Sequence, residues 1–119
     1  MVAEGKIQRS KSAAGAQIRL VRKPNGEFRL CVDYRGLNKV TLKNRYPIPL
    51  ISKLKERLNR VKIFTKLDLK NGYYLICMAK GNEPKTAFRT RFGLYEWKVM
   101  RFGLCNAPAT FQAMMDDLF

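Results

Sequence analysis

The 119-residue sequence contains no histidine and only three cysteines, which lie far apart. Without histidine there is no His general base and no Ser-His or Cys-His nucleophile pair. The cysteines form no C-x-x-C motif, which excludes the usual zinc-binding patterns. Each is flanked by apolar residues, so we interpret Cys31, Cys77 and Cys105 as small core residues. Free thiols fit an intracellular, reducing compartment, and nothing distinguishes cytoplasm from nucleus.

Long apolar runs and acidic residues are also scarce. No apolar run approaches the ~20 residues that span a bilayer and no signal peptide is recognised, so we expect no membrane partner. The net charge is +15, and it is uneven. Residues 1–62 hold 16 Lys and Arg against 4 Asp and Glu, a net charge of +12, whereas residues 63–119 hold 8 against 5, a net charge of +3. This excess indicates that the first half of the chain binds a polyanionic partner, most often nucleic acid.

Hydrophobic residues make up 46% of the chain, enough for the core of one α+β domain. Residues 1–15 are small, polar and basic, and we interpret them as a flexible lead-in to a single domain over residues 16–119. Two β-type runs, residues 16–22 and 28–33, flank an Asn-Gly pair. That pair is the strongest short signal for a β-hairpin, so the domain is predicted to begin with a basic hairpin.

Further elements follow from the spacing of apolar residues. Residues 85–91 and 94–100 alternate polar with apolar positions and predict a second hairpin. Residues 49–60 and 107–119 carry apolar residues every three or four positions and predict two helices. We expect the apolar stripe of the first helix to be core; it consists of Ile51, Leu54 and Leu58.

The stretch around Asp68 organises the rest of the chain. Residues 63–69 are mainly apolar or β-forming and predict a buried strand that carries Asp68 close to its end. Asn71 and Gly72 then break the run with turn chemistry, and two tyrosines follow. A carboxylate beside backbone that can approach a ligand suits Mg²⁺ and nucleotide binding. The alternative is that Asp68 only ends the strand or caps the next turn.

Five segments of the chain carry motifs that occur together in a fixed order: LVRKPNGEFRLCVDYRGLNKVT, RYPIPLISKLKERL, KLDLKNGYYLI, KTAFRTRFGLYEWKVM and RFGLCNAPATFQ. Their order and spacing are those of reverse transcriptases, and the chain resembles the gypsy class of LTR retrotransposons from about Gly5 to Phe119. The resemblance implies an RNA-directed DNA polymerase with a partial right-hand fold, fingers and part of the palm, in which antiparallel hairpins pack with short helices. Its partners would be an RNA template, a DNA primer and deoxynucleoside triphosphates, within a larger pol polyprotein.

The resemblance also implies roles for single residues, although it assigns no particular residue to binding of the template or primer. Asp68 matches the first catalytic aspartate, which binds both Mg²⁺ ions of a two-metal transfer, and the Leu69 carbonyl is a further ligand. The other matched positions surround the incoming nucleotide. They are the fingertip cations Lys23 and Arg29, with Arg22 able to share the Lys23 role; Asn71 and Gly72, whose backbone approaches the phosphates; Tyr73, which excludes a ribose 2′-OH; and Phe102 and Gly103, which pack against nucleotide and template.

The chain departs from the family pattern in three places. Arg101 stands where Met-Pro-Phe-Gly has proline, and Ser12-Ala13 stands where Ser-Pro is usual. Losing two rigid turn residues indicates either a drifting copy or a local backbone change that disturbs Phe102. The family's Tyr-x-Asp-Asp motif does not occur before Phe119, so we expect a truncated domain that is inactive by itself. The alternatives are a non-catalytic, basic nucleic-acid-binding remnant of such an element, or a degenerate copy without a function.

Overall fold

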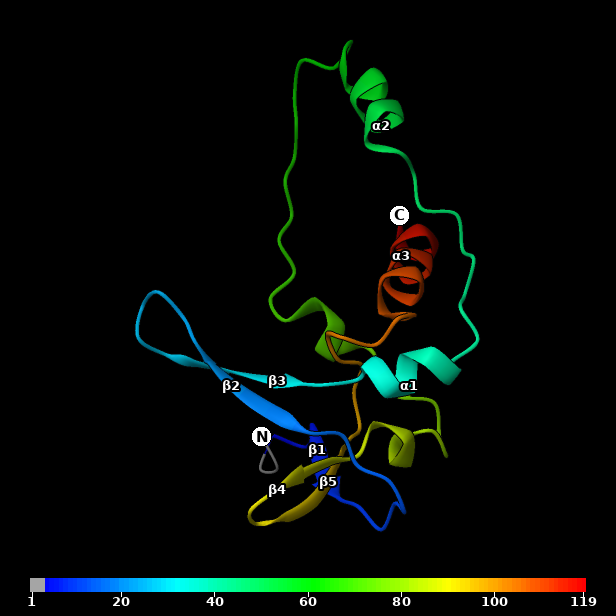
Figure 1. The fold of residues 1–119 in the computed structure, drawn as a ribbon. Coiled ribbons are helices and arrows are strands. Elements are labelled where there is room, and N and C mark those ends of the chain that lie inside the picture. The colour runs from blue at the N-terminus through cyan, green and yellow to red at the C-terminus, as the bar shows by residue number, and fades with distance from the viewer. Residues whose placement is uncertain (1–3) are drawn as a thin grey trace.

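The computed structural model describes residues 4–119, which form antiparallel strands, α-helices and two 3-10 turns (Figure 1), so the predicted α+β class is confirmed. The elements, in chain order, are β1 (Ile7–Arg9), β2 (Ile18–Arg22), β3 (Phe28–Val32), α1 (Arg35–Val40), α2 (Ile51–Leu58), the 3-10 turns η1 (Gly72–Leu75) and η2 (Glu83–Thr86), β4 (Phe88–Thr90), β5 (Gly93–Trp97) and α3 (Ala107–Leu118).

The first predicted hairpin is confirmed as the two-stranded sheet β2–β3. Its turn is closed by the Lys23 amide, which donates to the Glu27 carbonyl over 2.7 Å, and Gly26 adopts a φ of +88°. Glycine reaches that left-handed conformation at little cost, which is why the Asn-Gly pair marks the turn. In Figure 1 this hairpin projects to one side of the molecule.

The second hairpin, β4–β5, is also confirmed, but it belongs to a three-stranded sheet of order β1-β5-β4. Strand β1 pairs with β5 so that Ile7 lies opposite Trp97. This strand corrects the prediction that residues 1–15 are a flexible lead-in; of these, residues 1–3 lie outside the described part of the chain. The three residues of β1 carry no recognisable alternation, and their conformation depends on a partner almost 90 residues away.

The core lies where this sheet meets the segment that follows the first hairpin. Trp97 is 0% exposed, and Phe88 and Tyr34 are buried beside it. The rings of Phe88 and Trp97 have centroids 5.6 Å apart, within the range of favourable aromatic packing. The two hairpins are therefore joined through aromatic side chains.

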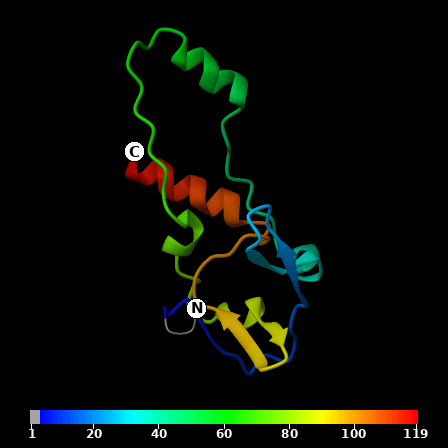
Figure 2. The ribbon, with the colours of Figure 1, turned by 90° about the vertical axis from the view of Figure 1, so that its left-hand side faces the viewer.

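Helix α2 stands away from this core at the end of two extended connections (Figures 1 and 2). The radius of gyration is 17.1 Å, larger than the about 13.5 Å expected of a compact chain of this length. The helix is shorter than predicted, and its apolar stripe is not core, because Ile51 is 72% exposed and Leu54 and Leu58 are also exposed. No helix of residues 4–119 is long and apolar enough to cross a membrane.

The predicted buried strand over residues 63–69 is wrong. These residues run extended and exposed, with Ile63 86% exposed, and no described backbone hydrogen bond joins them to another segment. A strand is defined by the hydrogen bonds of a neighbouring strand, and no described strand lies alongside this one. The cysteines also need correction, since Cys77 is exposed whereas Cys31 and Cys105 are only half-buried.

Candidate nucleotide-binding site

Three aromatic residues from separate parts of the chain meet at one place. The ring of Tyr73, in η1, lies 4.5 Å from that of Phe102, centroid to centroid, and 5.2 Å from that of Phe111 in α3. Phe102 is 66% exposed, so the cluster opens to solvent. The structure thus brings together two of the predicted site residues. The third, Phe111, was predicted only as part of the apolar helix face, and its spacing carried no further signal.

The turn at Asn71 and Gly72 delivers Tyr73 to this cluster. Asn71 has φ 54° and ψ 43°, the left-handed conformation that asparagine tolerates better than most residues. Its carbonyl accepts a 2.8 Å hydrogen bond from the Tyr74 amide. A Cβ atom on Gly72 would lie 3.0 Å from Cε2 of Phe111, which leaves little room for a side chain. The predicted turn therefore brings the backbone close to the aromatic rings.

The segment that holds Phe102 is tied to α1. The side-chain amide of Asn38 donates to the Gly103 carbonyl over 2.7 Å, and its oxygen accepts from the Cys105 amide over 3.0 Å. Gly103 has a φ of +97°, which favours glycine. Phe102 reaches Tyr73 even though Arg101 stands in place of the usual proline. Asn38 is a positioning residue that sequence reasoning missed, because a surface asparagine in a short helix carries no distinguishing pattern.

The three predicted fingertip cations lie on the β2–β3 hairpin but not on one face. Side chains alternate along a strand, and cross-strand partners share a face. Arg29 is opposite Val21, whereas Arg22 is opposite Phe28, which places Arg22 on the other face. The same alternation puts Lys23 on the face of Arg29, where its Nζ lies 3.0 Å from a Glu27 carboxylate oxygen. Within residues 4–119 no ion pair involves Arg22 or Arg29.

Asp68 and Leu69 lie in the extended, exposed connection that precedes the Asn71 turn. Over the described part of the chain, no three potential ligands among His, Cys, Asp and Glu gather closely enough to hold a metal. Mg²⁺ sites use one or two carboxylates together with substrate oxygens, and Asp68 offers only one carboxylate between Lys66 and Lys70. These residues alone do not form a complete metal site, so no metal-dependent step follows from this geometry.

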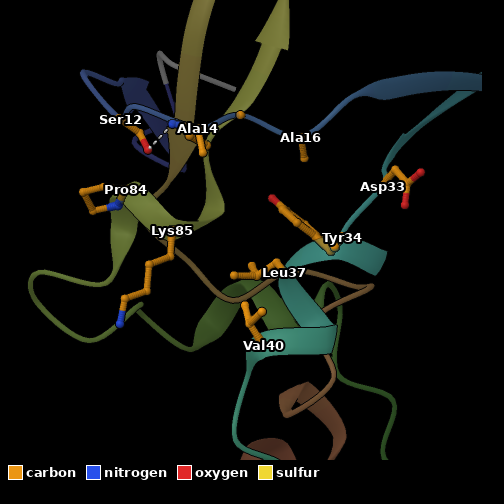
Figure 3. A pocket seen from close by; sticks show the side chains of 12 residues that line it. Ser12, Ala14, Ala16, Asp33, Tyr34, Leu37, Val40, Pro84 and Lys85 are labelled. Carbon is orange, nitrogen blue, oxygen red and sulfur yellow. Dashed lines mark hydrogen bonds between the residues drawn. The ribbon is translucent and has the colours of Figure 1, made fainter.

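A cavity of about 510 Å³ lies elsewhere, between residues 12–16, α1 and the η2 turn (Figure 3). The Tyr34 ring stands between Ala16 and Leu37 in this view, and most of the wall is apolar. None of the site residues predicted from the sequence lines this cavity. It is therefore separate from the aromatic cluster at Tyr73.

Comparisons with known proteins agree with the order of motifs. The family described as "Reverse transcriptase (RNA-dependent DNA polymerase)" matches residues 21–119. An RNA-directed DNA polymerase homolog of Oenothera berteroana is 53% identical over 91 residues, which cover 76% of this chain and 64% of that protein. The transposon Tf2-3 polyprotein of Schizosaccharomyces pombe is 43% identical over 114 residues, which cover 96% of this chain. The chain spans only 9% of that polyprotein.

Solved structures of foamy virus protease-reverse transcriptase have the same fold. The complex with an RNA/DNA hybrid has a TM-score of 0.80 and 25% identity, and the match covers 98% of this chain and 16% of that one. The selenomethionine-labelled CSH mutant of the prototype foamy virus protein has the same TM-score with 28% identity and the same coverage. The predicted polymerase fold is thus confirmed. With relatives among retrotransposon polyproteins, the chain belongs to the reverse transcriptase (RNA-dependent DNA polymerase) family.

Proposed function

We propose that this chain supplies the fingers and part of the palm of an RNA-directed DNA polymerase encoded by a gypsy-class LTR retrotransposon. The observation that carries the proposal is the contact between Tyr73 and Phe102, 4.5 Å between ring centroids, directly after the left-handed turn at Asn71. An aromatic pair that opens to solvent beside a closely approaching backbone suits the sugar and base of a nucleotide.

The residues around Tyr73 and Phe102 would each contact a different part of a bound deoxynucleoside triphosphate. The Tyr73 ring occupies the space that a ribose 2′-OH would need, and Phe102 and Gly103 pack against the base and template. The backbone N–H groups of Asn71 and Gly72 donate to the phosphates, as exposed turn amides do in other anion sites. Lys23 and Arg29, which share one face of the hairpin, attract the triphosphate; Arg22 faces away and contributes less.

Asp68 would be the first metal ligand of the longer polymerase. It makes no ion pair within residues 4–119, so its carboxylate is available to Mg²⁺, and the Leu69 carbonyl is a second candidate oxygen. The remaining carboxylates must come from outside these residues. Two bound Mg²⁺ ions would stabilise charge on the attacking and leaving oxygens of an in-line phosphoryl transfer.

The partners of the proposed polymerase are an RNA template and a DNA primer inside the cell. Structures of foamy viral protease-reverse transcriptase have been solved in complex with an RNA/DNA hybrid and with double-stranded DNA. The net charge of +12 over residues 1–62 favours the same class of polyanion here. A second function, non-catalytic binding of nucleic acid, is favoured by the same charge and by the single carboxylate at Asp68.

Sugar discrimination tests the role of Tyr73. The chain is fused after Phe119 to a family Tyr-x-Asp-Asp hairpin and thumb, and incorporation of ribonucleotides is compared with that of deoxyribonucleotides. We expect Tyr73→Ala to raise relative ribonucleotide incorporation, whereas Phe92→Ala, which removes an exposed aromatic in the β4–β5 turn, leaves it unchanged. Unaltered discrimination in a folded Tyr73→Ala fusion would reject the role of this side chain.

Catalysis separates the two candidate functions. In the active fusion, Asp68→Asn should abolish incorporation while leaving nucleic-acid binding intact, because a neutral amide oxygen binds Mg²⁺ far more weakly than a carboxylate does. The 119-residue chain alone should bind nucleic acid without polymerising. Incorporation by the Asp68→Asn fusion, or by the bare chain free of contaminating polymerase, would show that Asp68 does not have the proposed role.

A further inference from the structure

Arg101, which replaces a proline of the family pattern, is buried in the aromatic core. It is 7% exposed, and its guanidinium carbon lies 4.6 Å from the centroid of Trp97 and 5.6 Å from that of Tyr74. No carboxylate of residues 4–119 forms an ion pair with it. Cation–π attraction to two rings therefore holds this charge where an acidic partner would be expected.

The guanidinium also reaches the first hairpin, since Nη2 of Arg101 donates to the Leu30 carbonyl on β3. Hydrogen bonds join Lys23 to Glu27 and Asp33 to Gln17, so the hydrogen-bonded pairs of this antiparallel hairpin fall on odd-numbered residues. Leu30, opposite Leu20, belongs to a non-hydrogen-bonded pair, and its carbonyl points outward from β3. Arg101 thus occupies part of the open edge of the hairpin.

The neighbours of these contacts are the residues of the proposed nucleotide site. Arg29 precedes Leu30, Phe102 follows Arg101, and Tyr73 precedes Tyr74. The two segments run antiparallel, with Tyr73 against Phe102 and Tyr74 beside the Arg101 guanidinium. The Arg101 side chain therefore contacts the neighbour of Arg29 and the neighbour of Tyr73, while its backbone is bonded to Phe102.

We propose that Arg101 is a positioning residue that clamps the β2–β3 hairpin, with its cation Arg29, to the Tyr73–Phe102 pair. Proline has no side chain that reaches β3, so this clamp is a property of chains that carry arginine here. The functional part of the inference rests on the proposed nucleotide site, whereas the clamp itself is a structural relationship that can be tested separately.

The buried charge of Arg101 is poorly compensated, so its positioning role can be tested separately from its effect on the free energy of unfolding. Burial, and to a smaller degree the nearby Arg29 cation, lowers the pKa of Arg101. Its Nε and the indole N–H of Trp97 are buried without hydrogen-bond partners among the described residues. Replacing a poorly compensated buried charge by an apolar side chain of similar length often leaves stability unchanged. An Arg101→Met variant should thus release the hairpin without unfolding the core.

The test compares hydrogen exchange in the 119-residue chain and its variants by NMR. In Arg101→Met, we expect amides of β2–β3 to exchange roughly tenfold faster, as after loss of one charge-assisted hydrogen bond, while β4–β5 amides change by less than about twofold. Arg101→Lys should behave like Arg101→Met, because an ammonium lacks the planar fork that stacks and donates together. Urea unfolding followed by emission of the single tryptophan, Trp97, verifies folding; if Arg101→Met is unfolded, Arg101→Lys carries the test.

Arg91→Met is the matched control. Arg91 is exposed and lies over Phe92 at 4.7 Å, so the variant loses the same charge and a cation–π contact without touching β3. Equal acceleration in both sheets, no acceleration in the hairpin, or full protection in Arg101→Lys would overturn the clamp.

Affinity for an RNA–DNA hybrid at low salt tests the functional part. Arg101→Met should weaken binding more than Arg91→Met does, and equal weakening would reduce Arg101 to one cation among many. A wild-type chain that binds no hybrid would reject the proposed function, while the exchange data would still decide the clamp.

Discussion

The hydroxyl of Tyr34 donates a 2.8 Å hydrogen bond to the backbone carbonyl of Thr86, in the interior of the domain and across 52 residues of sequence. The Thr86 hydroxyl in turn accepts a 2.9 Å hydrogen bond from the Trp97 amide. This pair connects the segment after the first hairpin to the sheet that contains Trp97. A buried hydroxyl and carbonyl that satisfy each other fix how the two hairpins pack.

Tyr34→Phe should destabilise the chain by about 1–2 kcal/mol, because the Thr86 carbonyl would remain buried without a donor. Urea unfolding monitored through Trp97 emission measures the loss. The matched control is Tyr46→Phe, which removes an exposed hydrogen bond of 2.7 Å to Asp116 and should cost much less. Equal losses in the free energy of unfolding would mean that the buried hydrogen bond contributes no more to stability than the exposed one.

Stability should also depend on Asp33 in acid. Hydrogen bonds from the Arg35 side chain and backbone lower the pKa of Asp33 from 3.8 to about 2. A lowered pKa in the folded state stabilises the fold above the unfolded pKa, and this contribution is lost as pH falls from about 4 to 2. The pair is exposed, so added salt should weaken it.

Asp33→Asn should therefore flatten the fall in stability between pH 4 and 2, whereas Glu56→Gln, at a residue without an ion pair in the described part of the chain, should not. NMR titration of the Asp33 carboxyl gives the pKa directly. A value near 3.8 would contradict the contact with Arg35.

Two glycines should respond to alanine with opposite signs. In Gly72→Ala the new Cβ would meet the Phe111 ring at 3.0 Å, so we expect a loss of about 1 kcal/mol and a shifted Tyr73 environment. Gly36 lies in α1, where an added methyl group would have nothing within 4 Å, so Gly36→Ala should raise stability by about 0.5–1 kcal/mol. Unfolding curves and Tyr73 chemical shifts distinguish the two; a stabilising Gly72→Ala would refute the close approach.

Binding to random-sequence RNA–DNA hybrid should be governed by phosphate contacts. The logarithm of the affinity should fall linearly with the logarithm of salt concentration, with a slope near −0.9 for each phosphate neutralised. Replacing Lys23 and Arg29 together by Gln should reduce the slope, because both lie on one face of the β2–β3 hairpin. Titrations by fluorescence anisotropy across a salt series measure this. An affinity that does not change with salt concentration would exclude binding through phosphate contacts.

The amino-acid sequence by itself determined the elements whose signals are local. The Asn-Gly pair at residues 25 and 26 specified the first hairpin, and apolar spacing specified α3 almost to the residue. The contact of Asp33 with Arg35 was also predictable, because the two residues are neighbours in a turn. The order of five motifs identified the family, because that order is read directly from the sequence and does not depend on how the elements pack. In each case the determining residues lie close together in the chain or simply follow one another.

Only the tertiary structure decided which segments have partners. Strand β1 exists because β5 lies beside it, whereas residues 63–69, with a stronger β pattern, have no described strand to pair with. Arg101 has no sequence pattern that distinguishes it from a surface cation, yet it is buried between Trp97 and Leu30. Helix α2 has an apolar stripe and no described surface that covers it. Periodicity reports which face of an element is apolar, but burial depends on distant residues that come alongside only when the chain folds.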